Sequence, residues 1–224
     1  MYFTNKLSSI NKRDLMADRR RSTTKDKWKE KSWYTIVAPS YFGEKEIGMS
    51  PSSDPNYMIG RTIAVPVSTF TGNFKKASSM VLFKVDNCEG KRCTTKFIGH
   101  EVSDDTIRRM VRRRRERMDI VTDVKTKDFF NIAVKLVLVA DQKLTGTKRS
   151  EIRSSVVSFI TGKASEMELG SFANYIIGDD VYGDLVNALK DVYPIRKIEI
   201  RKTEIGQREA PEANTQEPVE AVPN

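Results

Sequence analysis

The chain has 224 residues, and its 39 Lys and Arg residues against 30 Asp and Glu residues give a formal net charge of +9. This length can bury one large or two small cores, but a hydrophobic fraction of 38% indicates that part of the chain lies outside them. The basic balance favours a polyanionic partner, either nucleic acid or an anionic membrane surface. No apolar run approaches the roughly 20 residues that span a bilayer, and residues 1–31 lack the apolar region of a secretory signal, so we expect a cytoplasmic protein.

Residues 1–31 form a basic segment with few apolar side chains and no sustained period. This composition predicts an extended RNA-binding arm that orders on a polyanion, and a flexible tail that serves only solubility is the alternative. Trp28 suits either stacking on a base or anchoring the core, whereas we expect Trp33 in the core. The candidate RNA contacts of the arm are Arg19, Arg20, Arg21, Lys25, Lys27, Trp28 and Lys29.

Strand patterns dominate the first two thirds of the chain. The strongest is 129–140, where Phe130, Ile132, Val134, Leu136 and Leu138 occupy one face without a break, and a turn at 125–128 joins it to a strand at 120–124. A strand with one apolar face and one partly polar face suits a barrel or a sheet that is covered on one side. Shorter strand signals lie at 33–38, 61–67, 80–85 and 94–98, the second confined to an edge or bulge by Pro66.

Beyond residue 146 the apolar residues recur at the spacing of an α-helix. A first helix ends at Gly162, a capping box from Ser165 to Glu168 begins a second, and a third ends before Pro194. A last strand follows near residue 200, and the remaining residues are rich in Glu, Pro and Ala. We therefore predict an α+β protein: an antiparallel β-barrel-like sheet followed by packed helices and a final strand, over residues 32–204, with a disordered acidic tail at 205–224.

A dense arginine cluster lies at residues 108–117. The pattern predicts a helix capped by Ser103 and anchored by Ile107, Val111 and Met118, with arginine rows on its two flanks. Like charges at this density repel one another, and arginine pairs bidentately with phosphate, so RNA is the predicted partner. The alternatives are a solvated face or a localisation signal, while a membrane surface fits the narrow apolar stripe less well. The cluster comprises Arg108, Arg109, Arg112, Arg113, Arg114, Arg115 and Arg117.

No residue pattern argues for catalysis. His100 is the only histidine, and the phosphate-loop and nucleophile-elbow motifs are absent from the sequence. The aspartate pairs at 104–105 and 179–180 lie where helices are expected to begin, so helix capping explains them without a bound metal ion. We expect Cys88 and Cys93 to be reduced thiols around a turn, with a disulfide as the alternative. We predict no enzyme, no catalytic or metal-binding residue and no cofactor.

The run KDKWKEKSWY at residues 25–34 resembles the opening of the ribosomal S-three-Ae family (e-S-one in the unified naming), found in the small subunits of archaea and eukaryotes. The resemblance covers roughly residues 25–204, and the short length looks archaeal. The chain departs from the family after Arg61, where Ala64, Thr69 and Asn73 replace expected acidic residues. The other similar stretches, in the same order, are IGR at 59–61, KFIGH at 96–100, VRRRRERMD at 111–119, VKTKD at 124–128 and YPIRKIEIRK at 193–202.

The resemblance implies a β-barrel with packed helices on the platform of the small subunit, bound to ribosomal RNA near its 3′ end and close to the messenger exit. Neighbouring ribosomal proteins would be partners, with further docking of messenger RNA or initiation factors, and the role would be assembly and scaffolding. The competing hypotheses are a free-standing RNA-binding module, such as an RNA chaperone or translation regulator, and a nucleic-acid enzyme with a carboxylate-held ion. Beside the arginine cluster and the arm, the implied RNA contacts are Arg196, Lys197, Arg201 and Lys202.

Overall fold

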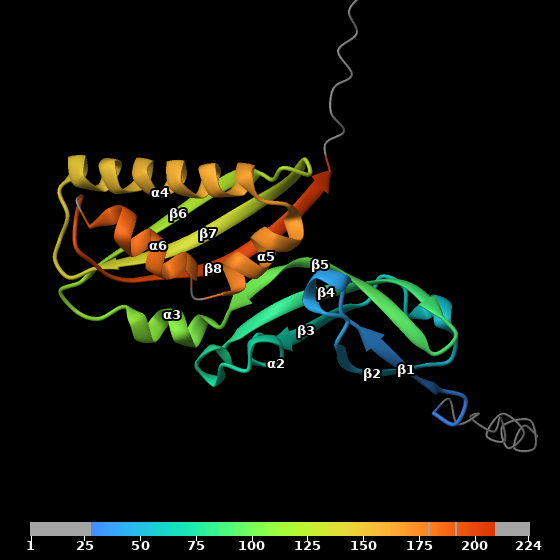
Figure 1. The fold of residues 1–224 in the computed structure, drawn as a ribbon. Coiled ribbons are helices and arrows are strands. Elements are labelled where there is room, and N and C mark those ends of the chain that lie inside the picture. The colour runs from blue at the N-terminus through green and yellow to red at the C-terminus, as the bar shows by residue number, and fades with distance from the viewer. Residues whose placement is uncertain (1–27, 179, 191, 209–224) are drawn as a thin grey trace, which may run out of the picture.

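The computed structural model describes residues 28–178, 180–190 and 192–208. Over this part of the chain the protein is α+β, with one eight-stranded sheet and helices packed on it (Figure 1). The strands run in the order β2-β1-β5-β8-β7-β6, and β4 pairs with both β5 and β3. The predicted class and the final strand are thus confirmed. The sheet is open rather than a closed barrel, and it is mixed because β1 and β5 run parallel.

In the N-terminal half, between residues 28 and 102, the structure describes five strands and four short helical turns. β3 lies at an edge and pairs only with β4, as Pro66 predicted, because proline has no N–H to donate to a second neighbour. The rings of Phe42, Phe83 and Phe97 pack against one another in the core of this half. The elements are β1 (Ser32–Val37), η2 (Ser40–Phe42), β2 (Glu46–Ser52), η3 (Pro55–Tyr57), β3 (Thr62–Pro66), α2 (Ser68–Thr71), η4 (Phe74–Lys76), β4 (Ser79–Glu89) and β5 (Arg92–Val102).

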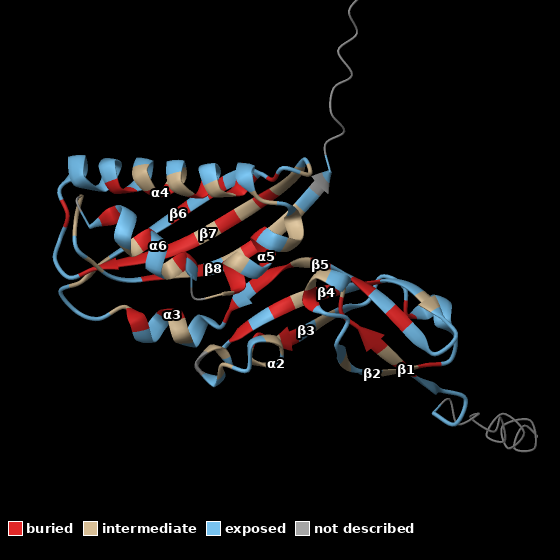
Figure 2. Cartoon of the chain, in the orientation of Figure 1, coloured by how far each residue is buried: buried red, intermediate tan, exposed pale blue. Residues whose placement is uncertain are grey.

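In the C-terminal half, α4, α5 and α6 cover one face of the sheet and α3 lies against the other (Figure 1). Both faces of β7 are therefore buried from residue 136 to residue 140, while one face is only partly buried before that (Figure 2). Ile132 and Leu136 pack on the helices, and Val137 and Val139 pack on α3, which explains why β7 alternates poorly on its second face. The elements are α3 (Asp104–Met110), β6 (Glu116–Lys125), β7 (Phe130–Ala140), α4 (Gly146–Glu166), α5 (Leu169–Ile177), α6 (Asp180–Leu189) and β8 (Ile195–Arg208).

The last strand joins the two halves. β8 lies between β5 and β7, so the end of the described chain pairs with strands from both halves. A Cβ atom on Gly99 of β5 would lie 2.0 Å from the backbone oxygen of Thr203 on β8, so only glycine permits this approach. The amine of Lys76 adds a second link, because Nζ donates hydrogen bonds to the carbonyls of Ile177 and Gly178 at the end of α5, both at 2.7 Å.

Beyond residue 146, two helix boundaries and one strand boundary differ from the sequence predictions. α4 continues through Gly162 to Glu166, and Ser165 does not cap α5, because its hydroxyl donates to the carbonyl of Thr161 one turn earlier. The first N–H of α5, that of Leu169, instead donates to the Asp128 carboxylate at 3.0 Å. β8 continues to Arg208, past the predicted start of the tail at residue 205, while 209–224 lie outside the described residues.

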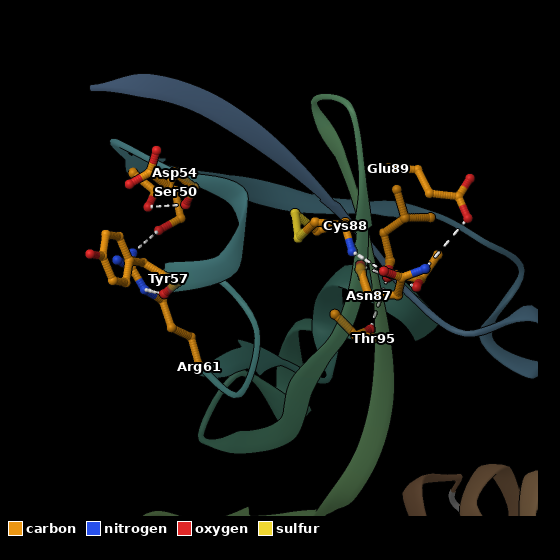
Figure 3. The surroundings of a disulfide bond; sticks show 12 residues. Ser50, Asp54, Tyr57, Arg61, Asn87, Cys88, Glu89 and Thr95 are labelled. Atoms are coloured by element: carbon orange, nitrogen blue, oxygen red, sulfur yellow. Dashed lines mark hydrogen bonds between the residues drawn. A yellow bond between two sulfur atoms is a disulfide. The ribbon is translucent and has the colours of Figure 1, made fainter. Parts of the chain in front are cut away.

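The two cysteines form a disulfide, so the expectation of reduced thiols is wrong for this structure. Cys88 and Cys93 are direct partners in the β4–β5 hairpin, with Cα atoms 4.0 Å apart. Figure 3 shows the bond beside Asn87, whose side chain accepts from the Cys88 N–H and donates to Glu89. The bond therefore closes the hairpin near its turn, where Gly90 has a φ of +61°.

Candidate nucleic-acid interface

The arginine cluster is divided among three local structures, so the predicted basic helix is wrong beyond residue 110. Arg108 and Arg109 lie in the last turn of α3, which ends at Met110, and Arg117 lies on β6. The intervening residues form the Arg turn, defined here as Arg112–Arg115, closed by the N–H of Arg115 donating to the carbonyl of Arg112 at 3.2 Å. The helix ends because every second residue of β6 from Met118 to Val124 is buried, a strand period that begins earlier than predicted.

The Arg turn contains a backbone conformation that arginine rarely adopts. Arg114 has a φ of 68°, in the left-handed region that favours glycine and costs other residues about 1 kcal/mol. The turn thus keeps a charged side chain where glycine would be better tolerated. Strained residues of this kind cluster at binding sites, which makes the Arg turn a candidate contact on conformational as well as electrostatic grounds.

The fold brings the Arg turn to the beginning of β8. Together they line an open cleft of about 450 Å³ whose cationic residues come from α3, the Arg turn and β8. We call this the basic cleft. Its lining residues are Ser78, Thr106, Arg109, Met110, Arg112, Arg115, Val139, Arg196 and Lys197. Of the predicted sites, the structure therefore unites three cluster arginines with the Arg196–Lys197 pair, about 80 residues away in the sequence.

One carboxylate beside the basic cleft holds two of its cations. Oδ1 of Asp141, just after β7, lies 3.6 Å from Nε of Arg115 and 3.2 Å from Nη1 of Arg196. A shared carboxylate between the Arg turn and β8 orients both guanidinium groups while neutralising one charge. The sequence pattern did not indicate Asp141, Ser78 or Thr106, because none of them belongs to a basic run or a motif.

Most of the cluster has no internal counter-charge. Within the described residues, no carboxylate lies in ion-pair contact with any of five arginines, whereas Arg115 has Asp141 and Arg117 has Asp119. All five are exposed, so their charges are available to a polyanion. The five are Arg108, Arg109, Arg112, Arg113 and Arg114.

The remaining predicted contacts in β6 and β8 are compensated by acids. Asp119 accepts two hydrogen bonds of 2.8 Å from Arg117, and this bonding raises the pKa of the Arg117 guanidinium. Arg201 lies 3.1 Å from a carboxylate oxygen of Asp104.

Lys202 is compensated in the same way. Its ammonium lies 2.9 Å from Glu204, whose pKa is lowered to about 2 by hydrogen bonds from Lys135 and Lys202. Arg117, Arg201 and Lys202 are therefore weaker candidates for RNA contact than the five arginines that have no ion-pair partner in the described residues.

The beginning of the described chain carries two exposed indoles. The side chain of Trp33 is 56% exposed on β1, so its predicted place in the core is wrong; Tyr34 and Ile36 face the core instead. Trp28 is 60% exposed, with Nζ of Lys31 4.6 Å from its ring centroid. Lys29 is exposed in the turn at 28–31, and the other arm candidates, Arg19, Arg20, Arg21, Lys25 and Lys27, lie outside the described residues.

His100 has a packing environment rather than a catalytic one. Its side chain is 2% exposed, and Nδ1 has no hydrogen-bond partner among the residues that the structure describes. Burial and the nearby Lys76 charge lower the pKa of His100 to about 4. Within the described residues, no three His, Cys, Asp or Glu side chains are grouped as metal ligands. The helices in this part of the chain are too short or too polar to cross a membrane.

The open sheet, the uncompensated arginines and the basic cleft define a basic scaffold of the kind that binds a nucleic-acid backbone. Residues 19–209 match the Ribosomal S3Ae family, and the chain belongs to that family. It is 62% identical over 205 residues to the small ribosomal subunit protein eS1 of Picrophilus torridus, covering 90% of this chain and 98% of the relative.

More distant relatives carry the same name. The small ribosomal subunit protein eS1 of Thermoplasma acidophilum is 54% identical over 181 residues, which cover 81% of this chain and 84% of the relative. That of Saccharolobus islandicus is 36% identical over 183 residues, which cover 82% and 88%. The predicted family and its archaeal character are thus confirmed.

Proposed function

We propose that this protein is a structural, non-enzymatic constituent of the small ribosomal subunit and that it binds ribosomal RNA through the basic cleft and the exposed arginines around it. The names of its relatives support the ribosomal role. The observation that carries the RNA contact is the group of five exposed arginines without a carboxylate partner in the described chain, two of which, Arg109 and Arg112, also line the basic cleft. Only a polyanion would neutralise this density of charge without a loss of stability.

The location within the subunit rests on the family resemblance. We place the protein on the platform of cytoplasmic ribosomes, beside the 3′ end of the ribosomal RNA, the messenger exit and neighbouring ribosomal proteins. In this arrangement the folded part of the chain, through the end of β8 at Arg208, supplies the main contact, the arm at 1–31 follows the RNA, and the acidic residues from 209 onward avoid it. Docking of messenger RNA or initiation factors belongs to the same proposal. Ultraviolet crosslinking of intact subunits tests it, since crosslinks far from the rRNA 3′ end would refute the placement.

The RNA contact is tested by salt dependence. If about 8 phosphates are neutralised, log K against log salt should have a slope near −7, and changing Arg112–Arg115 to Gln should flatten it by about 3 to 4. The matched control changes Arg201 and Lys202 to Gln, which removes compensated cations and should flatten the slope by less than one. Equal slopes for the two variants would contradict the assignment.

Sedimentation separates the ribosomal role from a free-standing RNA-binding module. A ribosomal constituent should migrate with small subunits and dissociate only at high salt, because its contacts are largely electrostatic. A chaperone or regulator would bind RNA with the same arginines but remain mostly outside the subunit fraction. RNA binding without co-sedimentation would therefore favour the second function.

A further inference from the structure

The outer face of β1 and β2 carries exposed apolar side chains that the arginine cluster does not explain. Tyr34 of β1 is buried in the core, so its neighbours Trp33 and Thr35 lie on the opposite face of the sheet. The register of β1 and β2 sets Pro51 opposite Trp33 and Met49 opposite Thr35, and residues directly opposite each other share a face. The side chains of Trp33 and Met49 are 56% and 64% exposed. We call these four residues the indole platform.

The indole platform lies away from the Arg turn. β2 and β6 are the two ends of the strand order β2-β1-β5-β8-β7-β6, so the platform is at one edge of the sheet and Arg117 of β6 is at the other. In Figure 1, β1 and β2 are likewise well separated from α3, which ends at Met110 just before the arginine turn. A ligand of the platform is therefore distinct from a ligand of the basic cleft.

Two cations border the indole platform. Thr35 pairs with Met49 on one side and with Arg92 of β5 on the other, so these three residues form a row across three strands, about 10 Å long. Lys91 is fixed beside it, because its carbonyl accepts a hydrogen bond of 2.8 Å from the N–H of Thr35. Lys91 and Arg92 are exposed, and among the described residues no carboxylate makes an ion pair with either of them.

The acids of the β4–β5 hairpin do not neutralise these cations. Glu89 is the direct partner of Arg92 in the hairpin, but its carboxylate accepts instead from the side chain of Asn87 at 3.4 Å (Figure 3). Further along the hairpin Lys96 does have an acidic partner, Asp86, at 2.7 Å. Positive charge is therefore uncompensated at the end of the hairpin that adjoins the exposed indole.

Single-stranded RNA is the partner that fits this combination. An unpaired base exposes a flat apolar face and its phosphate carries negative charge, so an aromatic ring beside uncompensated cations can hold both. In a duplex the base faces are stacked on one another and are not accessible. The sequence that leads into β1 adds to the positive charge, because residues 19–31 contain seven Lys and Arg against two Asp and Glu. This charge favours RNA over a neighbouring apolar protein surface.

We propose that the indole platform binds an unpaired segment of RNA, with a base stacked on Trp33 and the adjacent phosphates on Lys91 and Arg92. The inference rests on the proposed function for the identity of the polyanion. It adds a second contact surface, at the other edge of the sheet, that reads the single-stranded character of RNA and not only its charge. The arginine cluster and the platform would thus hold different parts of the same RNA.

Alanine substitution of Trp33 tests the stacking contact in the full-length protein. Trp33→Ala should weaken binding of an oligoadenylate of about 10 nucleotides at least about fivefold, the lower end of the contribution of one stacked base, and Trp33→Phe should restore most of the loss. An RNA duplex with the same number of phosphates should bind Trp33→Ala within about twofold of the wild type. Phe74→Ala is the matched control, because it also removes an exposed aromatic ring, 87% exposed on η4, and should leave both affinities unchanged.

The emission of Trp33 gives a second readout that folding defects would not imitate. Trp28→Phe leaves Trp33 as the single indole of the chain, and oligoadenylate should quench its emission whereas the duplex should not. Equal binding by Trp33→Ala and the wild type, with unquenched emission, would overturn the inference while duplex binding through the arginines upholds the proposed function. Failure to bind either RNA at low salt would overturn both.

Intact small subunits distinguish RNA from a protein neighbour. A photoreactive side chain placed by Trp33→p-benzoylphenylalanine should crosslink to ribosomal RNA in subunits assembled with the variant. Crosslinks to ribosomal proteins alone would overturn the inference, because the platform would then be a protein-docking surface. The same photoreactive substitution at Phe74 is the control, and it should not give the RNA crosslink obtained at position 33.

Discussion

Replacing the buried imidazole of His100 with leucine should remove an acid-sensitive part of the stability. The pKa of His100 is about 4 in the folded protein and near 6.5 when the chain is unfolded, because burial and the Lys76 charge disfavour the protonated ring. The unfolded state therefore takes up the proton first as pH falls. The stabilisation is complete above about pH 6.5, declines as pH falls towards 4, and changes no further below that.

The size of this effect follows from the same two values. A difference of about 2.5 pKa units corresponds to about 3 kcal/mol at roughly 1.4 kcal/mol per unit. The free energy of unfolding, measured with urea, should fall between pH 7.5 and pH 3.5 in both proteins. In the wild type it should fall by about 3 kcal/mol more than in His100→Leu. Because the same carboxylates titrate in both proteins, their contribution to the pH dependence cancels in the comparison. Parallel curves would show that the ring is protonated in the folded state or is solvated.

Three further predictions concern the close contact between β5 and β8, the disulfide-closed hairpin and the two indoles. Gly99→Ala should lower the free energy of unfolding by more than 3 kcal/mol, because its Cβ would collide with the β8 backbone; a loss below 1 kcal/mol in chemical denaturation would contradict this. A reductant should destabilise the wild type by about 2 kcal/mol, as expected for the short loop between Cys88 and Cys93, and should leave a double Cys→Ser variant unchanged. Trp28→Phe and Trp33→Phe should each leave one indole with solvent-like emission, and a blue-shifted spectrum from either would show that the remaining indole is buried.

Local patterns in the sequence were sufficient for several elements. The alternation of β7, the apolar stripes of α5 and α6, and the edge position that Pro66 imposes on β3 each depend on residues that are near one another in the chain. The α+β class follows from them. The Arg cluster could also be singled out as a candidate site, because its charge density is unusual whatever its conformation.

Other features depended on neighbours that are distant in the sequence. Arg112 and Arg114 lie in a turn because β6 pairs with β7 from Glu116 onward, and this pairing overrides a helical period that fits the same residues. Trp33 is exposed because the sheet is open and its outer face is uncovered there, which the composition of β1 alone did not indicate.

The sequence by itself determined the types of the main elements, the family and the excess of positive charge, since these reside in composition, short-range period and residue order. Only the tertiary structure decided that β8 enters the sheet between β5 and β7. That insertion places Arg196 beside the Arg turn, where Asp141 lies within ion-pair distance of both Arg196 and Arg115. The physical reason is that strand order and the cleft depend on pairing and burial between segments about 80 residues apart in the sequence. A pattern of neighbouring residues does not indicate such pairing.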